Sequence, residues 1–118
     1  MLNPVSEPIV QKVLPALRKV LARKLENRGY NQSEIAEMLE ITQPAVSQYL
    51  HSQRGHLSRE IEQDEELESY ASEMATLIST TGTRQDVGEV YREFCRCLVD
   101  KEDFPEILGY DREYFIDV

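Results

Sequence analysis

Apolar residues recur every three or four positions along most of this chain, the spacing that gathers them on one face of an α-helix. The first stripe, over residues 7–28, contains Val10, Val13, Leu14, Leu17, Val20, Leu21 and Leu25. Pro15 lies inside this segment, where its ring clashes with the preceding turn, so we expect a kink or break near Leu14. Gly29 follows and is expected to end the helix in the left-handed conformation.

Two short helices are predicted next, each with its own N-terminal signal. Asn31 can cap the first, Glu34 follows three residues later as in a capping box, and this helix should stop near Glu40. Thr42 can cap the second, over residues 43–51, with a proline in the first turn, where proline is tolerated. Such a pair is the pattern of a helix-turn-helix. The side chains expected to fill the wedge between the two helices are Ile35, Leu39, Ile41, Val46 and Tyr49.

Two longer helices complete the pattern. Apolar stripes indicate one from Ser58 to about Thr80, with an almost wholly charged first part, and one from Thr83 to about Asp100. A short helix is expected after Pro105. No segment alternates apolar and polar residues as a half-buried strand does, so the predicted fold class is all-α.

We therefore expect a helix-turn-helix headpiece in residues 1–59 and an acidic helical region in residues 60–118. The stripes of the two long helices are wider than a headpiece of this size can cover. We expect these helices to pack on the headpiece and to form a homodimer, because symmetry doubles the short site that one such unit reads. The candidate interface residues are Tyr70, Met74, Leu77, Tyr91, Phe94 and Leu98.

Charge is distributed unevenly along the 118 residues, a length that suggests one domain. The formal net charge is −9, which at first argues against a nucleic-acid partner. Residues 1–60, however, hold eight Lys and Arg against six Asp and Glu, a balance of +2, and the remainder carries −11. The overall acidity therefore does not exclude a local DNA-binding surface, because whole-chain averages conceal patches.

Other functional classes find little support. No run of 18 apolar residues occurs, and the start "MLNPVSEPIV" lacks the pattern of a signal peptide, so no membrane association and a cytoplasmic location are expected. Cys95 lies on an apolar stripe and is expected in the core, and Cys97 is too close to it to staple distant segments; a metal site or redox switch is the alternative. We find no catalytic triad, phosphate loop or paired-carboxylate pocket, so neither an enzyme nor a cofactor is expected.

The run "QSEIAEMLEITQPAVSQYLH", from Gln32 to His51, closely resembles the helix-turn-helix of the phage repressor/Cro (XRE-type) family. The matching positions are Ala36, Ile41, Gln43, Val46 and Ser47. Glu40 stands where that family usually has glycine, which suggests a slightly different turn.

With the flanking "VLPALRKVLARKLENRGYNQSEIA" and "SQRG", the chain looks more particularly like archaeal helix-turn-helix transcriptional regulators, over roughly residues 5–59. Some of these carry a thiamine-phosphate-synthase-like ligand domain. No such segment is expected within these 118 residues, so the resemblance implies DNA binding but not thiamine sensing.

The helix over residues 43–51 is the expected reader of double-stranded DNA, because the major groove admits one α-helix and amide side chains can pair bidentately with adenine. The candidate base contacts are Gln43, Pro44, Ala45, Ser47, Gln48 and His51. The candidate phosphate contacts are Gln32, Ser33, Thr42 and Arg54, with Arg18, Lys19, Arg23 and Lys24 from the first helix.

These features predict a sequence-specific transcriptional regulator that binds a pseudo-palindromic site as a homodimer, with half-sites about 34 Å apart. The alternative is a helix-turn-helix protein-interaction module, a subunit of a transcription or toxin–antitoxin assembly. The operator and any small-molecule effector stay open.

Overall fold

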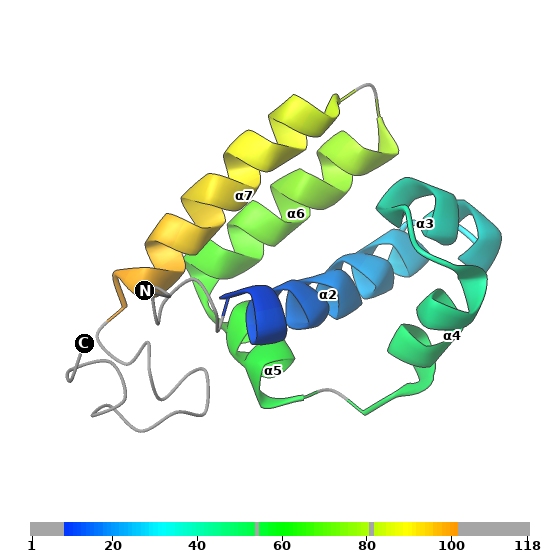
Figure 1. Ribbon diagram of the computed structural model, residues 1–118, viewed down its shortest axis with the longest axis horizontal. Coiled ribbons are helices and arrows are strands. Elements are labelled where there is room, and N and C mark those ends of the chain that lie inside the picture. Colours follow the sequence, from blue (N-terminus) through cyan, green and yellow to red (C-terminus); the bar gives the residue numbers. More distant parts are fainter. Residues whose placement is uncertain (1–8, 54, 81, 102–118) are drawn as a thin grey trace.

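The computed structural model describes residues 9–53, 55–80 and 82–101, and all regular structure within these ranges is helical (Figure 1). In chain order the elements are the π-helix η1 (Ile9–Val13) and the α-helices α2 (Leu14–Asn27), α3 (Gln32–Leu39), α4 (Gln43–His51), α5 (His56–Gln63), α6 (Glu65–Ser79) and α7 (Arg84–Val99). No strand occurs in the described ranges, so the expected all-α class is confirmed. The short helix expected after Pro105 and the expected start of the first segment at residue 7 lie outside the described residues.

The expected break near Leu14 is confirmed as a change of helix type. Residues 9–13 form a π-turn, and α2 begins at Leu14 with Pro15 at its second position. A proline in a regular α-helix clashes with the carbonyl four residues earlier. The wider π-turn directly before the proline replaces the α-helical turn in which this clash would occur.

The end of α2 is a Schellman motif built on Gly29. This glycine has φ +99°, and its N–H donates to the carbonyl of Glu26 at 2.9 Å while the N–H of Tyr30 donates to that of Leu25 at 3.2 Å. Both bonds satisfy carbonyls that the helix end leaves unpaired. The expected left-handed cap at Gly29 is therefore confirmed.

The single helix expected from Ser58 to Thr80 is wrong, because the chain breaks at Asp64. This residue is extended (φ −85°, ψ 121°), and its carboxylate accepts the N–H groups of Glu66 and Leu67 at 3.0 Å each. Aspartate is a strong N-cap, so it starts a new helix where the apolar stripe alone suggested continuity. The first of the two helices begins earlier than expected, at His56.

Helix α2 lies between the other elements. It packs against α3, α4 and α5 and also against α6, while α6 and α7 run side by side as a hairpin (Figure 1). Helix α5 spans both sides of residue 59 and joins the same core. The buried side chains include Val13, Val20, Leu25, Ile35, Val46, Ile61, Leu67, Met74, Phe94 and Leu98. Of the two long C-terminal helices, α6 packs on α2 and α3, whereas α7 packs mainly on α6.

In the part of the chain that the structure describes, no helix has both the length and the apolar character needed to cross a membrane.

Candidate nucleic-acid interface

Helices α3 and α4 pack against each other and begin at the caps that the sequence predicts. The Asn31 side chain accepts the N–H of Glu34 at 2.8 Å, and the Glu34 carboxylate accepts the N–H of Asn31 at 2.9 Å, a complete capping box. The Thr42 hydroxyl accepts the N–H of Ala45 at 3.2 Å. The wedge between the helices is apolar, since Ile35, Ala36 and Val46 are buried and Leu39, Ile41 and Tyr49 pack against them.

The outward face of α4 carries the candidate base contacts. Gln43, Pro44, Gln48 and His51 are exposed, and Ala45 and Ser47 are half-buried. Neither glutamine amide bonds to another described residue, so both are available to an external partner.

His51 is less available than the glutamines. Its Nδ1 lies 2.8 Å from the carbonyl oxygen of Ser47 and 3.4 Å from the hydroxyl of that residue. The imidazole is thus held against the backbone of the last turn of α4 through Nδ1, and only Nε2 is left for an external contact.

The two helix N-termini differ in the donors that they offer to a phosphate. At α3 the N–H groups of Gln32 and Ser33 have no intrahelical partner. At α4 the proline at position 44 has no N–H and the Thr42 cap occupies that of Ala45, which leaves only the N–H of Gln43. The N-terminus of α3 therefore offers a phosphate more free N–H donors than the N-terminus of α4 does.

Two of the four candidate cations on α2, Arg23 and Lys24, contact other parts of the chain. The Nη2 of Arg23 donates to the Ser52 carbonyl at 3.1 Å, just after α4, and its Nη1 is buried without a hydrogen-bond partner among the described residues. Lys24 forms an ion pair with Glu68 of α6. Phosphate contacts by Arg23 and Lys24 stay a prediction, and they would require both side chains to give up these contacts.

The other candidate cations are placed differently. Lys19 is half-buried on α2, and Arg18 lies beside Tyr91, where its charge lowers the pKa of a tyrosine that burial raises overall. Arg54 lies outside the described residues.

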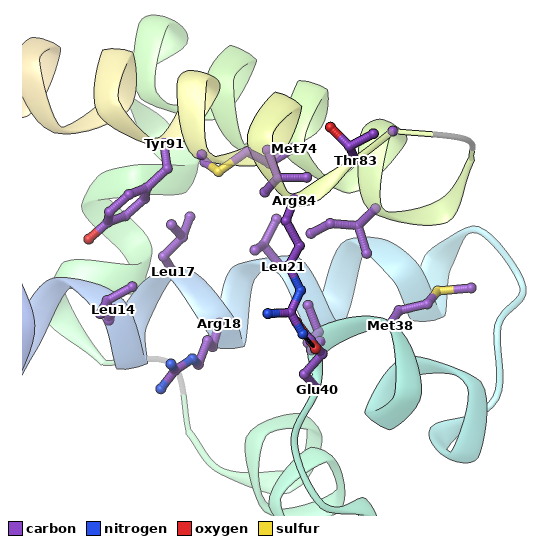
Figure 2. A pocket seen from close by; sticks show the side chains of 15 residues that line it. Leu14, Leu17, Arg18, Leu21, Met38, Glu40, Met74, Thr83, Arg84 and Tyr91 are labelled. Carbon is purple, nitrogen blue, oxygen red and sulfur yellow. Dashed lines mark hydrogen bonds and ion pairs between the residues drawn. The ribbon is translucent and has the colours of Figure 1, made fainter.

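The turn between α3 and α4 has a feature that sequence reasoning missed. Glu40 adopts the left-handed conformation (φ 57°, ψ 43°), and the N–H of Ile41 donates to the Ala36 carbonyl at 3.0 Å, as in the Schellman motif of α2. Its carboxylate forms an ion pair with Arg84, at the start of α7 (Figure 2). The acid at the turn is therefore neutralised by a residue 44 positions away in sequence.

A cavity of about 360 Å³ lies behind this turn. It is lined by α2, α6 and α7, by residues 38–40, and by Gly82 and Thr83 (Figure 2). Its apolar lining residues are Leu14, Leu17, Leu21, Met38, Leu39, Met74, Ile78, Val87 and Tyr91. No sequence signal pointed to this cavity, because its walls come from segments that meet only in the folded chain.

The proposed dimer residues fall into two groups. Met74, Phe94 and Leu98 are at most 1% exposed, so they belong to the core of the monomer and not to an exposed interface, which is a correction. Tyr70, Leu77 and Tyr91 are only half-buried.

The thiols of Cys95 and Cys97 are free and half-buried. Burial raises the pKa of both, the opposite of what a reactive thiolate requires. Within the described ranges, no three His, Cys, Asp or Glu side chains gather closely enough to hold a metal ion.

Comparisons of this chain with protein-family models, with curated proteins and with solved structures found no match. The established result is a small, compact all-helical domain.

Proposed function

We propose that this protein is a sequence-specific transcriptional regulator of the repressor/Cro-like helix-turn-helix class, which reads double-stranded DNA with α4. The observation that carries this proposal is the outward face of α4, where the exposed amides of Gln43 and Gln48 have no partner among the described residues. Neither residue packs in the core, and the amide side chain of glutamine can form two hydrogen bonds with adenine.

The remaining surface of the two helices complements this role. Pro44 and Ala45 offer apolar surface to a thymine methyl group, and Ser47 can donate or accept. The N–H groups at the start of α3 are free to hold a phosphate on the backbone beside the groove. Neutralisation of Glu40 by Arg84 removes an unfavourable charge from the turn between the two helices.

The regulator acts as a homodimer in this proposal, because one helix-turn-helix reads only a few base pairs. The half-exposed Tyr70, Leu77 and Tyr91 remain candidates for the interface. The expected site is pseudo-palindromic, with half-sites about 34 Å apart.

Selection of bound fragments from random DNA, followed by binding measurements on the selected site, tests the proposal. We expect Gln43→Ala and Gln48→Ala to lose about 1–3 kcal/mol of discrimination against mismatched sites. Gln85→Ala is the matched control, because Gln85 is also exposed but lies in the first turn of α7. If all three variants bind like the original chain, α4 is not the reader.

A protein-interaction module is the second candidate. The net charge of −9 and the internal engagement of Arg23 and Lys24 favour it, since both reduce the cations available to DNA. A salt titration separates the two functions, because DNA affinity falls linearly with salt on logarithmic axes as counterions are released. Failure to enrich any DNA sequence would favour the protein partner.

A further inference from the structure

The cavity behind the α3–α4 turn has a mainly apolar lining. Its volume of about 360 Å³ lies within the range of small-molecule sites, roughly 300–1,000 Å³. It exists because α2 and α7 both pack on α6 but make little contact with each other. The space is open to solvent, and an apolar occupant would remove its apolar lining from water.

Glycine at position 88 contributes to this space. Gly88 lines the cavity from α7, and a Cβ built on it would meet no atom closer than 3.9 Å. The position lies on the same side of α7 as Arg84 and Tyr91, four residues before and three after it. A Cβ at this position therefore has space, with the guanidinium of Arg92 as its nearest neighbour.

The polar groups of the cavity define the charge of an occupant. Arg18 and Arg84 supply two guanidinium groups and Glu40 one carboxylate, a balance of one positive charge (Figure 2). Arg84 is paired with Glu40, whereas Arg18 forms no ion pair with a described residue. Figure 2 shows Arg18 at the rim of the cavity with its guanidinium directed away from the apolar lining, so this side chain must turn inward to meet an occupant. In that position a guanidinium matches a carboxylate, which it can bind through two parallel hydrogen bonds.

We infer that this cavity binds a small molecule with an apolar body and a single carboxylate, held by Arg18. The apolar body contacts the leucines of α2 and Met74 of α6, and the mouth supplies one unmatched positive charge for one negative head group. A dianionic head would exceed that charge and a neutral one would leave it unmatched.

An occupant would also contact the reading unit. Met38 and Leu39 of α3 and Glu40 of the turn line the cavity, and the Arg84–Glu40 pair joins that turn to α7. Binding is therefore linked to DNA affinity, a consequence that rests on the proposed function, whereas the binding site itself does not.

Titration of the full chain with decanoate, 1-decanol and decyltrimethylammonium tests the site without DNA. The two described methionines both line the cavity, so ¹³C-methyl spectra of Met38 and Met74 report its occupancy. We expect saturable one-to-one shifts with decanoate, and binding at least about tenfold weaker with the neutral and cationic analogues. Absence of saturable shifts, or equal binding of decanoate and decanol, overturns the inference.

Two variants locate the ligand. Arg18→Gln should weaken decanoate about tenfold or more and leave decanol unchanged. Arg96→Gln is the control, because it makes the same change in net charge at an exposed residue of α7 that does not line the cavity, and it should have no effect. Gly88→Leu should abolish binding of both ligands by filling the cavity. If Arg18→Gln behaves like Arg96→Gln, or if Gly88→Leu binds decanoate like the original chain, the assignment fails.

The link to DNA is tested separately on the selected site. Decanoate should change the dissociation constant of the original chain and not that of Gly88→Leu. If decanoate leaves the dissociation constant for DNA unchanged but still shifts the methionine methyl signals, the link between the cavity and DNA binding is overturned and the binding site stands. Loss of DNA binding by every form of the protein overturns the proposed function and leaves the methyl result standing.

Discussion

The helix pairs α3–α4 and α6–α7 each contain a helix that starts with a capping box, but the two pairs differ in what their side chains do. Asn31 with Glu34 and Thr83 with Asp86 each form a complete capping box. The α3–α4 pair is short and exposes uncharged amides, whereas α6–α7 is long and buries large apolar side chains. The difference indicates that local signals start helices equally well in both places, and that the residues between the signals decide whether a pair builds the core or presents a surface.

The largest expected effect concerns the core of the α6–α7 pair. Phe94 is fully buried, and Phe94→Ala should lower the free energy of unfolding by about 3–5 kcal/mol through lost burial and a new cavity. Urea denaturation followed by circular dichroism measures this loss. Val90→Ala is the control, since Val90 is only half-buried on the same helix. A loss for Phe94→Ala no larger than that of the control would show that α7 contributes little to the core.

The turns before and after α3 are both Schellman motifs, and they allow a comparison of glycine with glutamate at a left-handed position. Gly29 and Glu40 both have positive φ, which a residue with a Cβ adopts at a cost of about 1–2 kcal/mol. Gly29→Ala should therefore destabilise the protein by about 1 kcal/mol or more. Glu40→Gly should relieve the strain of positive φ and stabilise the protein. The gain in stability should be smaller than the loss for Gly29→Ala, because glycine loses more chain entropy on folding and the ion pair with Arg84 is lost.

Thermal unfolding of both variants measures these changes. Glu40→Ala separates the two contributions at this position, because it removes the ion pair but keeps a Cβ at positive φ. Shifts of the same sign for Gly29→Ala and Glu40→Gly would contradict the account of both turns.

Loss of a cap tests whether α4 is held by its own signals. Thr42→Ala removes the acceptor for the N–H of Ala45 and should cost about 1 kcal/mol, whereas Thr42→Ser should cost much less. Chemical denaturation gives the stability change, and binding to selected DNA gives its effect on reading. Equal stabilities for the two variants would mean that packing alone starts α4.

The smallest expected change in stability concerns the ion pair between Lys24 of α2 and Glu68 of α6. The hydrogen bond from Lys24 lowers the pKa of Glu68 below its usual 4.5, so the pair stabilises the fold above that pH. This contribution is lost as the pH falls through the lowered value, and it should be under about 1 kcal/mol because water screens a partly exposed pair. Glu68→Gln should flatten this part of the stability–pH curve, and Glu73→Gln, on the exposed side of α6, should not.

Local signals in the sequence account for most of the helix boundaries. Asn31 and Thr42 cap α3 and α4, Pro15 marks the change of helix type, and Gly29 ends α2, because each acts on backbone groups within a few residues of itself. Asp64 was a missed signal of the same kind. An aspartate followed by two glutamates is favourable at a helix start, but the apolar stripe on either side suggested one helix.

The candidate site was only partly predictable. Periodicity identified the apolar and outward faces of α4, so Gln43 and Gln48 could be singled out from the sequence. The roles of Arg23 and Lys24 could not, because their partners Ser52 and Glu68 lie 29 and 44 positions away.

The sequence by itself determined the helical class, the caps and the amide-bearing face of α4, since these depend on interactions within one or two helical turns. Only the tertiary structure decided what covers each apolar face. Phe94 lies on a stripe that a core or a second copy could equally bury, and the folded chain places it inside. The Arg84–Glu40 pair and the cavity beside it arise in the same way, because they depend on the angle at which α7 meets α6 and not on any local pattern.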